Sequence, residues 1–596
     1  MKVYKKWAVA GLTMISAIAL AACSNDNSEV KSGFKPSVKM VDSYNNPSKS
    51  SSTYNNGTLK VAEFNSAPFA GITSPTLQTN AEDGDVYSPG SVNLFNVDNN
   101  NKIIDGGLAN LKLDKKSMTA TITINPKAKW SNGSKVIARD VEYPYEIIGA
   151  PDSPSQQYTE DMNAIKGMAE FHSGKAKTIS GITMPKGEKG NVVVIHFSKF
   201  APSLKYIGNT YMWSSIEPYE YIKNVPISKL ASSSEVRKNP IFAGPYKLSK
   251  QVTGESTSWV PNKYYYGKQA QIKHITIQVV NPNNFTSSLK AKQYDFAKSG
   301  GVSTQYPEVK QLKNYKEVGT IGTSYDLLGF NVGHFDSKKQ ENVMDSNAKM
   351  SNVKLRKAMM YALDIGALRK KFDNGLGWQP NSVISPYYKK YYNDKTPRYT
   401  LNISKANKLL DEAGYKKKGK WRTQPNGKPL VINYGAQTGT AASEAENSYY
   451  LQQWHKIGLN VQYAGGRPME MNKLYSILLK PKQDQVDIFE AGFSTGSEPT
   501  QTNFYGASAG FNIGHFASAK NTELLNNMNS AKSWNDEYRQ KQFKEWQTYL
   551  QDQAVYVPVS MSLSWTPVNT RVKGYSARSD DNEFWSNLQL TSSNPE

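Results

Sequence analysis

The single cysteine of this 596-residue chain, Cys23, comes directly after its only long apolar run, residues 7–20. That run is too short for a comfortable membrane span and lies where a secretory signal peptide belongs, so the sequence excludes a polytopic membrane protein. A lone thiol also excludes disulfide scaffolds, cysteine-rich zinc sites and iron–sulfur clusters. The rest of the chain must fold around hydrophobic cores, and at about 150 residues per domain its length predicts several of them.

The first 54 residues indicate where the protein is located. Lys2, Lys5 and Lys6 precede the apolar run, and Leu20-Ala21-Ala22-Cys23 closes it. This arrangement resembles the signal of bacterial lipoproteins, whose cysteine receives diacylglycerol and becomes the new N-terminus. It implies a signal peptide over 1–22, lipidation of Cys23 and anchoring to the extracytoplasmic face of the cell membrane, with an ordinary signal peptide as the alternative. Residues 23–54, rich in Ser, Asn, Lys and Pro, predict a flexible tether.

The chain is strongly basic, with 72 Lys and Arg against 50 Asp and Glu and a formal charge of +22. Nucleic acid is not the expected partner, because the signal peptide exports the chain away from it. Attraction to anionic lipid or wall polymer is a better interpretation of the charge, and a solvated surface is better still.

Apolar periodicity predicts a mixture of strands and helices. Residues 118–124 alternate between apolar side chains and Thr, which predicts a half-buried strand. Helical spacing of three and four recurs in three segments, and we expect Ser351 to cap the first, Ser404 to precede the second and Gly414 to end it. The three stripes are Leu355, Ala358, Met359, Ala362 and Leu363; Ala406, Leu409, Leu410 and Ala413; and Phe543, Trp546 and Leu550, followed by a strand over 554–559. The predicted class is α/β, as a mixed α+β fold with several lobes.

Motifs for catalysis and metal binding are almost absent. The chain has no phosphate-binding loop and no His-Glu-x-x-His pair, and its six histidines are scattered singly. Residues 506–510 match the Gly-x-Ser-x-Gly elbow of serine hydrolases around Ser508, but no helical apolar stripe follows. We therefore predict no catalytic residue, no metal and no cofactor, and keep a tethered hydrolase as an alternative.

Five segments in order carry a family resemblance. They are Trp130-Ser131-Asn132-Gly133 with Asp140-Val141; Asn239-Pro240 with Gly244-Pro245-Tyr246; Leu328-Gly329-Phe330-Asn331 with residues 353–364; Leu409-Leu410-Asp411-Glu412-Ala413-Gly414-Tyr415; and residues 454–461 before Val486-Asp487-Ile488. The set resembles the oligopeptide/dipeptide-binding family of extracytoplasmic solute-binding proteins of ABC importers. Pro144 departs from the family pattern, and we expect it to delay or distort the first turns of the helix after Asp140.

The resemblance implies a two-lobed fold like that of periplasmic binding proteins, of the large type, with a hinged ligand cleft. The first lobe would take residues 55–85, 235–320 and 560–596, with an inserted subdomain over 86–234, and the second lobe residues 321–559. It also implies an oligopeptide ligand, permease subunits with separate ATPases as partners, a monomeric receptor and no catalysis. Open alternatives are the same fold with a glycan, metal chelate, haem or signalling peptide, and an adhesin that uses the basic surface.

The resemblance also suggests ligand contacts. The family holds the amino terminus of the peptide with a carboxylate near a Gly-aromatic segment, which here reads Ala491-Gly492-Phe493-Ser494, with Glu498 as the nearest acid. The expected ligand-binding residues are Glu498, Phe493, Gly492, Ser494, Phe69, Gly71, Tyr505 and Asn512. A solvated Glu498 before Pro499 and a core position for Phe493 are the alternatives.

Overall fold

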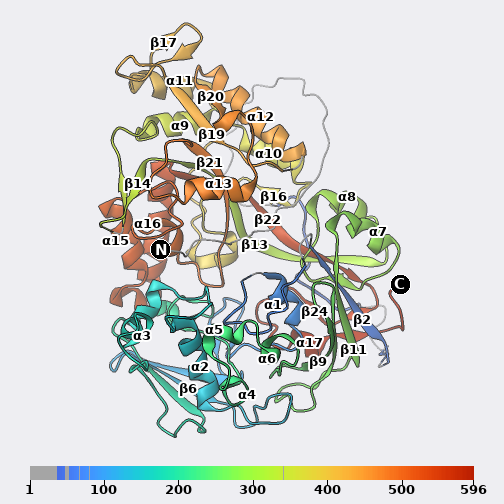
Figure 1. Cartoon of the computed structure of the whole chain (residues 1–596). Coiled ribbons are helices and arrows are strands. Elements are labelled where there is room, and N and C mark those ends of the chain that lie inside the picture. The colour runs from blue at the N-terminus through green and yellow to red at the C-terminus, as the bar shows by residue number, and fades with distance from the viewer. Residues whose placement is uncertain are drawn as a thin grey trace.

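The computed structural model describes residues 36–46, 53–54, 56–65, 68–79, 81–339, 341–439 and 441–596. The predicted signal peptide, Cys23 and most of the predicted tether lie outside these residues. Three sheets of four or more strands divide the described chain into three bodies, which lie at the lower right, lower left and top of Figure 1. We call them the five-stranded, four-stranded and six-stranded bodies.

The five-stranded body is assembled from distant parts of the chain. Its sheet has the order β12-β2-β11-β10-β9, in which β2 is parallel to both β11 and β12 and β10 is antiparallel to its neighbours. The strands are β2 (Thr58–Phe64), β9 (Tyr246–Val252), β10 (Ser256–Pro261), β11 (His274–Val280) and β12 (Phe296–Ala297). The surrounding elements are α1 (Ala81–Tyr87), α6 (Ser234–Arg237), η4 (Pro282–Asn284), α7 (Phe285–Lys290), η5 (Ser303–Gln305), α8 (Tyr306–Val309) and α17 (Phe584–Asn587), with the pairs β1 (Ser43–Tyr44)–β24 (Tyr575–Ser576) and β23 (Val572–Lys573)–β25 (Gln589–Leu590).

The four-stranded body is antiparallel and has its own hydrophobic core. Its sheet, in the order β5-β6-β8-β7, contains β5 (Ala109–Asp114), β6 (Thr119–Ile124), β7 (Ile182–Thr183) and β8 (Val192–His196). Around it lie β3 (Asn96–Val97) paired with β4 (Ile103–Ile104), α2 (Ala138–Gly149), η2 (Glu160–Ala164), α3 (Met168–His172), η3 (Pro202–Lys205), α4 (Tyr219–Ile222) and α5 (Ile227–Leu230).

Helix α2 contradicts the expectation for Pro144. The helix begins at Ala138 and continues through the proline to Gly149. Proline has no N–H for the carbonyl four residues earlier, but that carbonyl, on Asp140, accepts from the backbone N–H of Glu217 at 3.0 Å. The Asp140 carboxylate also accepts from the N–H of Ile137 at 3.0 Å, which satisfies a free donor at the helix start. Pro144 is tolerated within the helix because the backbone N–H of Glu217 replaces the missing hydrogen bond.

The six-stranded body is the largest. Its mixed sheet has the order β16-β22-β13-β21-β19-β20, with β13 (Tyr315–Phe330), β16 (Gly377–Trp378), β19 (Val431–Gly435), β20 (Asn460–Tyr463), β21 (Ile488–Ser494) and β22 (Tyr556–Asn569). Its helices are α9 (Val353–Tyr361), α10 (Ile365–Phe372), η6 (Pro386–Tyr391), α11 (Ile403–Glu412), α12 (Ala441–Lys456), η7 (Ala464–Gly466), α13 (Met471–Leu478), α14 (Thr502–Tyr505), α15 (Ala519–Met528), η8 (Ala531–Trp534) and α16 (Asp536–Gln553). Two hairpins complete it, β14 (Gly333–Asp336)–β15 (Glu341–Met344) and β17 (Lys417–Lys418)–β18 (Trp421–Arg422).

Strands β13 and β22 connect two bodies. They are antiparallel partners from Tyr315 opposite Asn569 to Gly329 opposite Tyr556, and Figure 1 shows them passing from the top body to the lower right one. Val318 and Val568 pack into the core of the five-stranded body, whereas Leu327 packs into that of the six-stranded body. The pairing has register shifts between Ile321 and Tyr325 and between Asp326 and Leu327. A two-stranded connection of this kind is where we expect the bodies to hinge, and the domain boundaries given above stay a prediction.

The predicted local elements are present, with small shifts at their ends except for the last strand, which was expected over 554–559 and extends to Asn569. The alternating segment forms β6, and the three stripes lie on α9, α11 and α16, followed by β22. The caps differ, because the side chains of Asn352 and Asn402 accept the first backbone bonds of α9 and α11, so Ser404 lies inside its helix. Gly414 has φ +80°, as expected of a residue that ends a helix.

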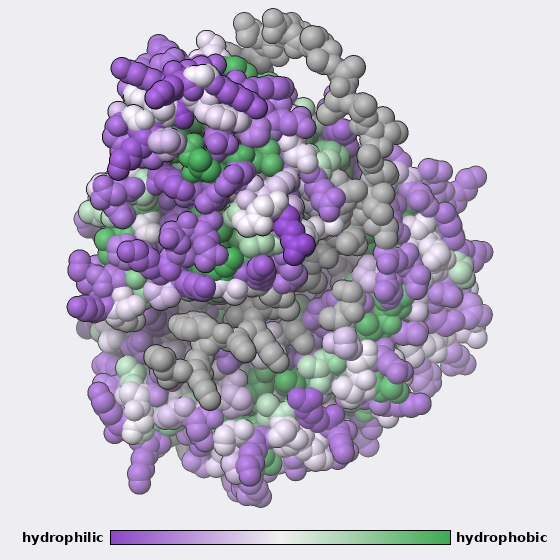
Figure 2. All heavy atoms as spheres, turned by 45° about the horizontal axis from the view of Figure 1, so that its top comes forward, coloured by the Kyte–Doolittle hydropathy of each residue, from purple (hydrophilic) through white to green (hydrophobic). Residues whose placement is uncertain are grey.

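The surface in Figure 2 is mostly hydrophilic, with hydrophobic residues scattered in small groups. Within the described part of the chain, no helix combines the length and the apolar character needed to cross a bilayer.

Candidate functional site

The second half of β21 has a free edge in the middle of the large sheet. On one side it pairs with β13, from Phe330 opposite Ile488 to Ser324 opposite Ser494. On the other side β19 pairs only with Ile488 and Phe489, and no other described strand continues the ladder. The remaining backbone, residues 491–494, therefore has no strand partner on that side, and such a sheet edge can accept another extended chain.

The backbone groups at this edge alternate in direction. The carbonyl of Glu490 accepts from the Gln437 side-chain amide at 3.2 Å, and Tyr475 on α13 lies near the amide of Gly492. Both groups point away from β13. Because antiparallel backbone repeats every two residues, the carbonyl of Gly492 and the N–H of Ser494 point the same way.

One face of this part of the sheet is polar and accessible. Ser324 and Asp326 on β13 and Ser494 on β21 are exposed, and Gly492 is half-buried between them. A Cβ added to Gly492 would lie 2.9 Å from Oδ1 of Asp326, so a glycine at this position leaves the carboxylate room. The residues that alternate with these, Tyr325 and Phe493, point into the core with their ring centroids 6.2 Å apart.

Asp326 lies in an acidic neighbourhood. Burial raises its pKa to about 6, with the Arg369 guanidinium opposing and Glu446 adding to the shift. Burial likewise raises the pKa of Glu490 to about 7 and that of Asp373 to about 7. The negative charges of Glu446 and Asp326 add to both shifts. Asp326 is thus accessible to water yet surrounded by protein, which describes a carboxylate in a recess. A carboxylate in such a recess attracts a cation that can enter the recess.

Glu498, the acid expected to hold the peptide ammonium, is already engaged. Its side chain forms an ion pair with Arg539, and its Oε2 accepts from the backbone N–H of Thr500 at 2.9 Å. Glu498 is 7% exposed and the Arg539 side chain 1%. A role in holding the ammonium stays a prediction, and it requires this pair to open.

The other expected ligand residues fall into two groups. Gly492 and Ser494 lie on the accessible face. Phe69, Phe493, Tyr505 and Asn512 are all buried within their bodies. The amide of Gly71 is bonded to Asp83 at 2.8 Å, and Asn512 bonds the carbonyls of Gly506 and Phe516 at 2.9 and 2.8 Å.

Sequence reasoning missed Asp326. Its signal was an acid within the strand pattern Ser324-Tyr325-Asp326-Leu327, which alternates polar and apolar residues directly before the quoted segment 328–331. The strand that would pair it with Gly492 lies more than 160 residues later in the chain.

The region around Ser508 does not form a nucleophile elbow. Helix α14 ends at Tyr505, and Ser508 lies exposed in a turn, with no strand leading into it. Among the described residues, no group of three or more His, Cys, Asp or Glu side chains could hold a metal ion.

Two bodies linked by paired strands, with an unpaired strand edge and a recessed carboxylate on one of them, define a hinged binding protein. The chain belongs to the bacterial extracellular solute-binding proteins, family 5 (Middle), whose model matches residues 104–515.

Named relatives span nearly the whole chain. The oligopeptide-binding protein OppA of Lactococcus lactis subsp. cremoris (strain SK11) is 37% identical over 590 residues, 98% of each chain. The structure of lactococcal OppA complexed with an endogenous peptide in the closed conformation is 36% identical, with a TM-score of 0.80 over 90% of this chain and 100% of that one. AppA of Bacillus subtilis, in complex with a nonapeptide, shares the fold at 19% identity and a TM-score of 0.66, over 90% of this chain and 99% of its own.

Proposed function

We propose that this protein captures oligopeptides outside the cytoplasm and delivers them to the permease of an ABC importer. The observation that carries the proposal is the free edge of β21 beside an accessible carboxylate, because a peptide offers extended backbone and a charged end. The full-length similarity to lactococcal OppA, which binds peptide, supports it.

The peptide backbone would add to the sheet as a further strand. The carbonyl of Gly492 and the N–H of Ser494 are the groups that would pair with it. Main-chain bonds do not depend on the peptide sequence, so this mode of binding accepts many peptides.

We place the peptide ammonium at Asp326, with Glu498 as the alternative that the experiments below decide. Asp326 has an accessible carboxylate opposite Gly492, whereas both oxygens of Glu498 have partners within the protein. Phe493 and Tyr505 would act indirectly, because their packing holds β21 in place. Phe69, Gly71 and Asn512 would likewise shape the two bodies.

The extracellular family supports an extracytoplasmic location. We propose further that a lipid on Cys23 anchors a monomeric receptor, and that ATP hydrolysis is performed by separate importer subunits. The bound peptide would be handed over uncleaved.

Isothermal titration of the full-length protein in detergent with a peptide pool tests the proposal. Unmodified peptides should bind at one site, and peptides N-methylated at alternate positions should bind at least about tenfold more weakly, because each loses strand hydrogen bonds. Mass spectrometry after incubation should recover the peptides intact, in the wild type and in Ser508→Ala alike.

Asp326→Asn sharpens the test. It should weaken binding of free peptides and leave N-acetylated peptides unaffected, whereas Asp484→Asn, an exposed acid of the same body, should change neither. Absence of heat with the whole pool, together with clear binding of another solute, would overturn the peptide assignment.

A further inference from the structure

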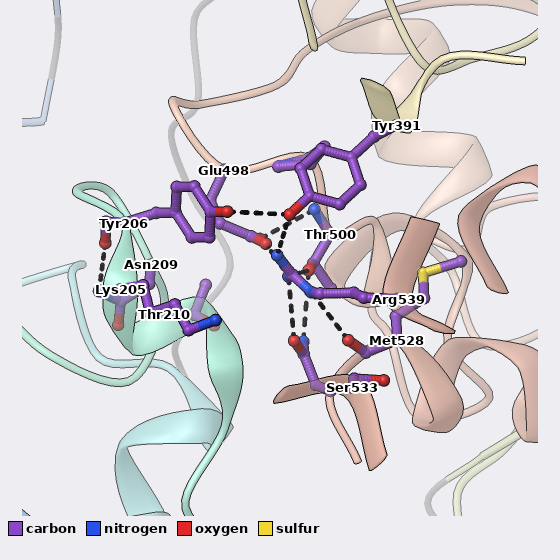
Figure 3. Close-up of polar contacts among 12 residues, drawn as sticks. Lys205, Tyr206, Asn209, Thr210, Tyr391, Glu498, Thr500, Met528, Ser533 and Arg539 are labelled. Atoms are coloured by element: carbon purple, nitrogen blue, oxygen red, sulfur yellow. Dashed lines mark hydrogen bonds and ion pairs between the residues drawn. The ribbon is translucent and has the colours of Figure 1, made fainter. Parts of the chain in front are cut away.

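Tyr206 joins the four-stranded body to the six-stranded body (Figure 3). It follows η3, and its hydroxyl lies 2.9 Å from that of Tyr391, the last residue of η6. Both tyrosines are 4% exposed. Burial raises the pKa of Tyr206, so this hydroxyl remains protonated and able to donate at physiological pH.

In the six-stranded body, Tyr206 contacts a group of residues centred on Arg539. Nη1 of Arg539, on α16, donates to the Tyr391 hydroxyl at 3.1 Å, and Nε donates to the carbonyl of Met528 at 3.0 Å. Glu498 balances its charge. The guanidinium lies 5.5 Å from the centre of the Tyr206 ring, a distance typical of a cation–π contact. Every partner of Arg539 named here belongs to its own body except Tyr206.

Two further contacts surround this one. Trp534 stacks on Phe200 with ring centroids 5.3 Å apart, and its Nε1 donates to the Phe200 carbonyl at 3.2 Å. Lys205, next to Tyr206, pairs with Asp536 at 3.2 Å.

Asn101, also in the four-stranded body, makes two more contacts with the six-stranded body. Its side-chain amide donates to the Tyr387 hydroxyl at 3.0 Å and to the Ser497 carbonyl at 3.2 Å. The four-stranded sheet shares no strand with the six-stranded sheet. These are side-chain contacts between separate bodies, and a hinge motion can break them as a unit.

We propose that Tyr206, Tyr391, Arg539, Glu498 and the Phe200–Trp534 stack form a closure latch, which sets how long a bound peptide is retained without touching the peptide. The proposal rests on the peptide-binding function proposed above. Tyr206, Tyr391, Arg539 and Glu498 are at most 7% exposed, so a ligand has no access to their polar groups while the latch is closed.

The latch acts through the equilibrium between open and closed forms. We take the free protein to be mostly open and to close only transiently, so the association rate of a peptide, which enters the open form, does not depend on contacts made only on closing. Release requires opening, so each latch contact that is lost speeds release and raises the dissociation constant by the same factor.

The first test is peptide release from Tyr206→Phe in the full-length protein, followed by stopped flow with a fluorescent peptide and an unlabelled chase. The substitution removes the hydroxyl pair and keeps the ring over Arg539. Release should be about three- to tenfold faster, the range of one hydrogen bond, with association unchanged. Tyr158→Phe is the matched control, because it removes a hydroxyl bond to Asn163 within the four-stranded body. Equal release rates for the two variants would overturn the latch.

The second test locks the bodies together. A Cβ on Gly208 would lie 3.4 Å from the Cβ of Ser497, close to the separation of about 3.5–4.5 Å found in disulfides. Gly208→Cys and Ser497→Cys are combined with Cys23→Ser, which leaves only the engineered thiols. The oxidised protein should hold its peptide until a reductant is added. Release at the rate of the reduced protein would reject a closing motion at this interface.

The same thiols measure closure without a ligand. Disulfide formation should be slower when Tyr206→Phe is added and unchanged when Tyr158→Phe is added, whatever the ligand proves to be. If the wild type binds no peptide but this difference holds, the proposed function fails and the latch stands. If peptides bind and the difference is absent, the latch fails alone.

Discussion

Two buried arginines pair with carboxylates in different mechanical settings. Arg571 and Asp295 have fully buried side chains joined by two bonds of 2.6 and 2.7 Å, and Arg571 also donates to the carbonyls of Ser592 and Thr58. All of these groups belong to the five-stranded body. Arg539 and Glu498 are almost as buried, but the ring of Tyr206 above them comes from another body. The first pair stabilises a single body, whereas the second also contributes to the contact between two bodies.

The largest expected effect is on the first pair. Asp295→Ala leaves the Arg571 guanidinium buried without its counter-charge, so the five-stranded body should lose about 3–5 kcal/mol of stability. Calorimetry of the full-length protein should show a lower melting temperature for that body, while peptide affinity measured well below the transition stays the same. Asp580→Asn, from the exposed pair with Arg578, should melt like the wild type. An unchanged melting temperature for Asp295→Ala would mean that carbonyls alone satisfy Arg571.

Glu498→Gln should have a smaller effect, and on a different quantity. Arg539 keeps a hydrogen-bond acceptor but loses its counter-charge, so the latch weakens and peptide affinity should fall by about tenfold. Because the latch does not touch the peptide, free and N-acetylated peptides should be affected equally. Glu412→Gln, from the exposed pair with Lys354, is the control and should bind both normally. A loss confined to free peptides would instead place the peptide ammonium at Glu498 and remove the distinction between latch and site.

The smallest effect concerns Asp326, which is not part of the latch. Its carboxylate interacts with the charges of Arg369, Glu446, Glu490 and Asp373. Its pKa is raised to about 6, so the carboxyl becomes protonated as the pH falls through that value. A peptide ammonium binds the ionised form. Affinity for free peptides should therefore fall by about fourfold from pH 7.0 to pH 5.5, while N-acetylated peptides change little. Titration calorimetry at the two pH values measures both, and a parallel loss for acetylated peptides would exclude Asp326 as the cause.

Local structure was largely predictable from the sequence. The alternation in β6 and the apolar stripes of α9, α11 and α16 are properties of neighbouring residues, so periodicity alone located them. The expectation for Pro144 was wrong because the group that replaces its missing bond, the N–H of Glu217, is 73 residues away in the chain.

The site was less predictable for the same reason. Gly492 and Ser494 were identified from a family motif, but which face of their strand is accessible depends on the pairing of β21 with β13. The commitment of Glu498 depends on Arg539, 41 residues later, and that pairing has no local pattern. Asp326 can be identified only from the strand register, which places it opposite Gly492.

The interrupted ladder between β13 and β22 has a mechanical consequence. Residues 322–324, which include Ser324, have no partner in β22, and they end two residues before Asp326 on the same strand. A narrow ribbon yields to torsion more readily than a wide sheet, and a gap in its rungs is its most compliant point. A peptide whose ammonium binds Asp326 lies close to this gap, so its size would alter the angle between the two bodies in the closed form. Peptides of different size would then present different closed forms to the permease.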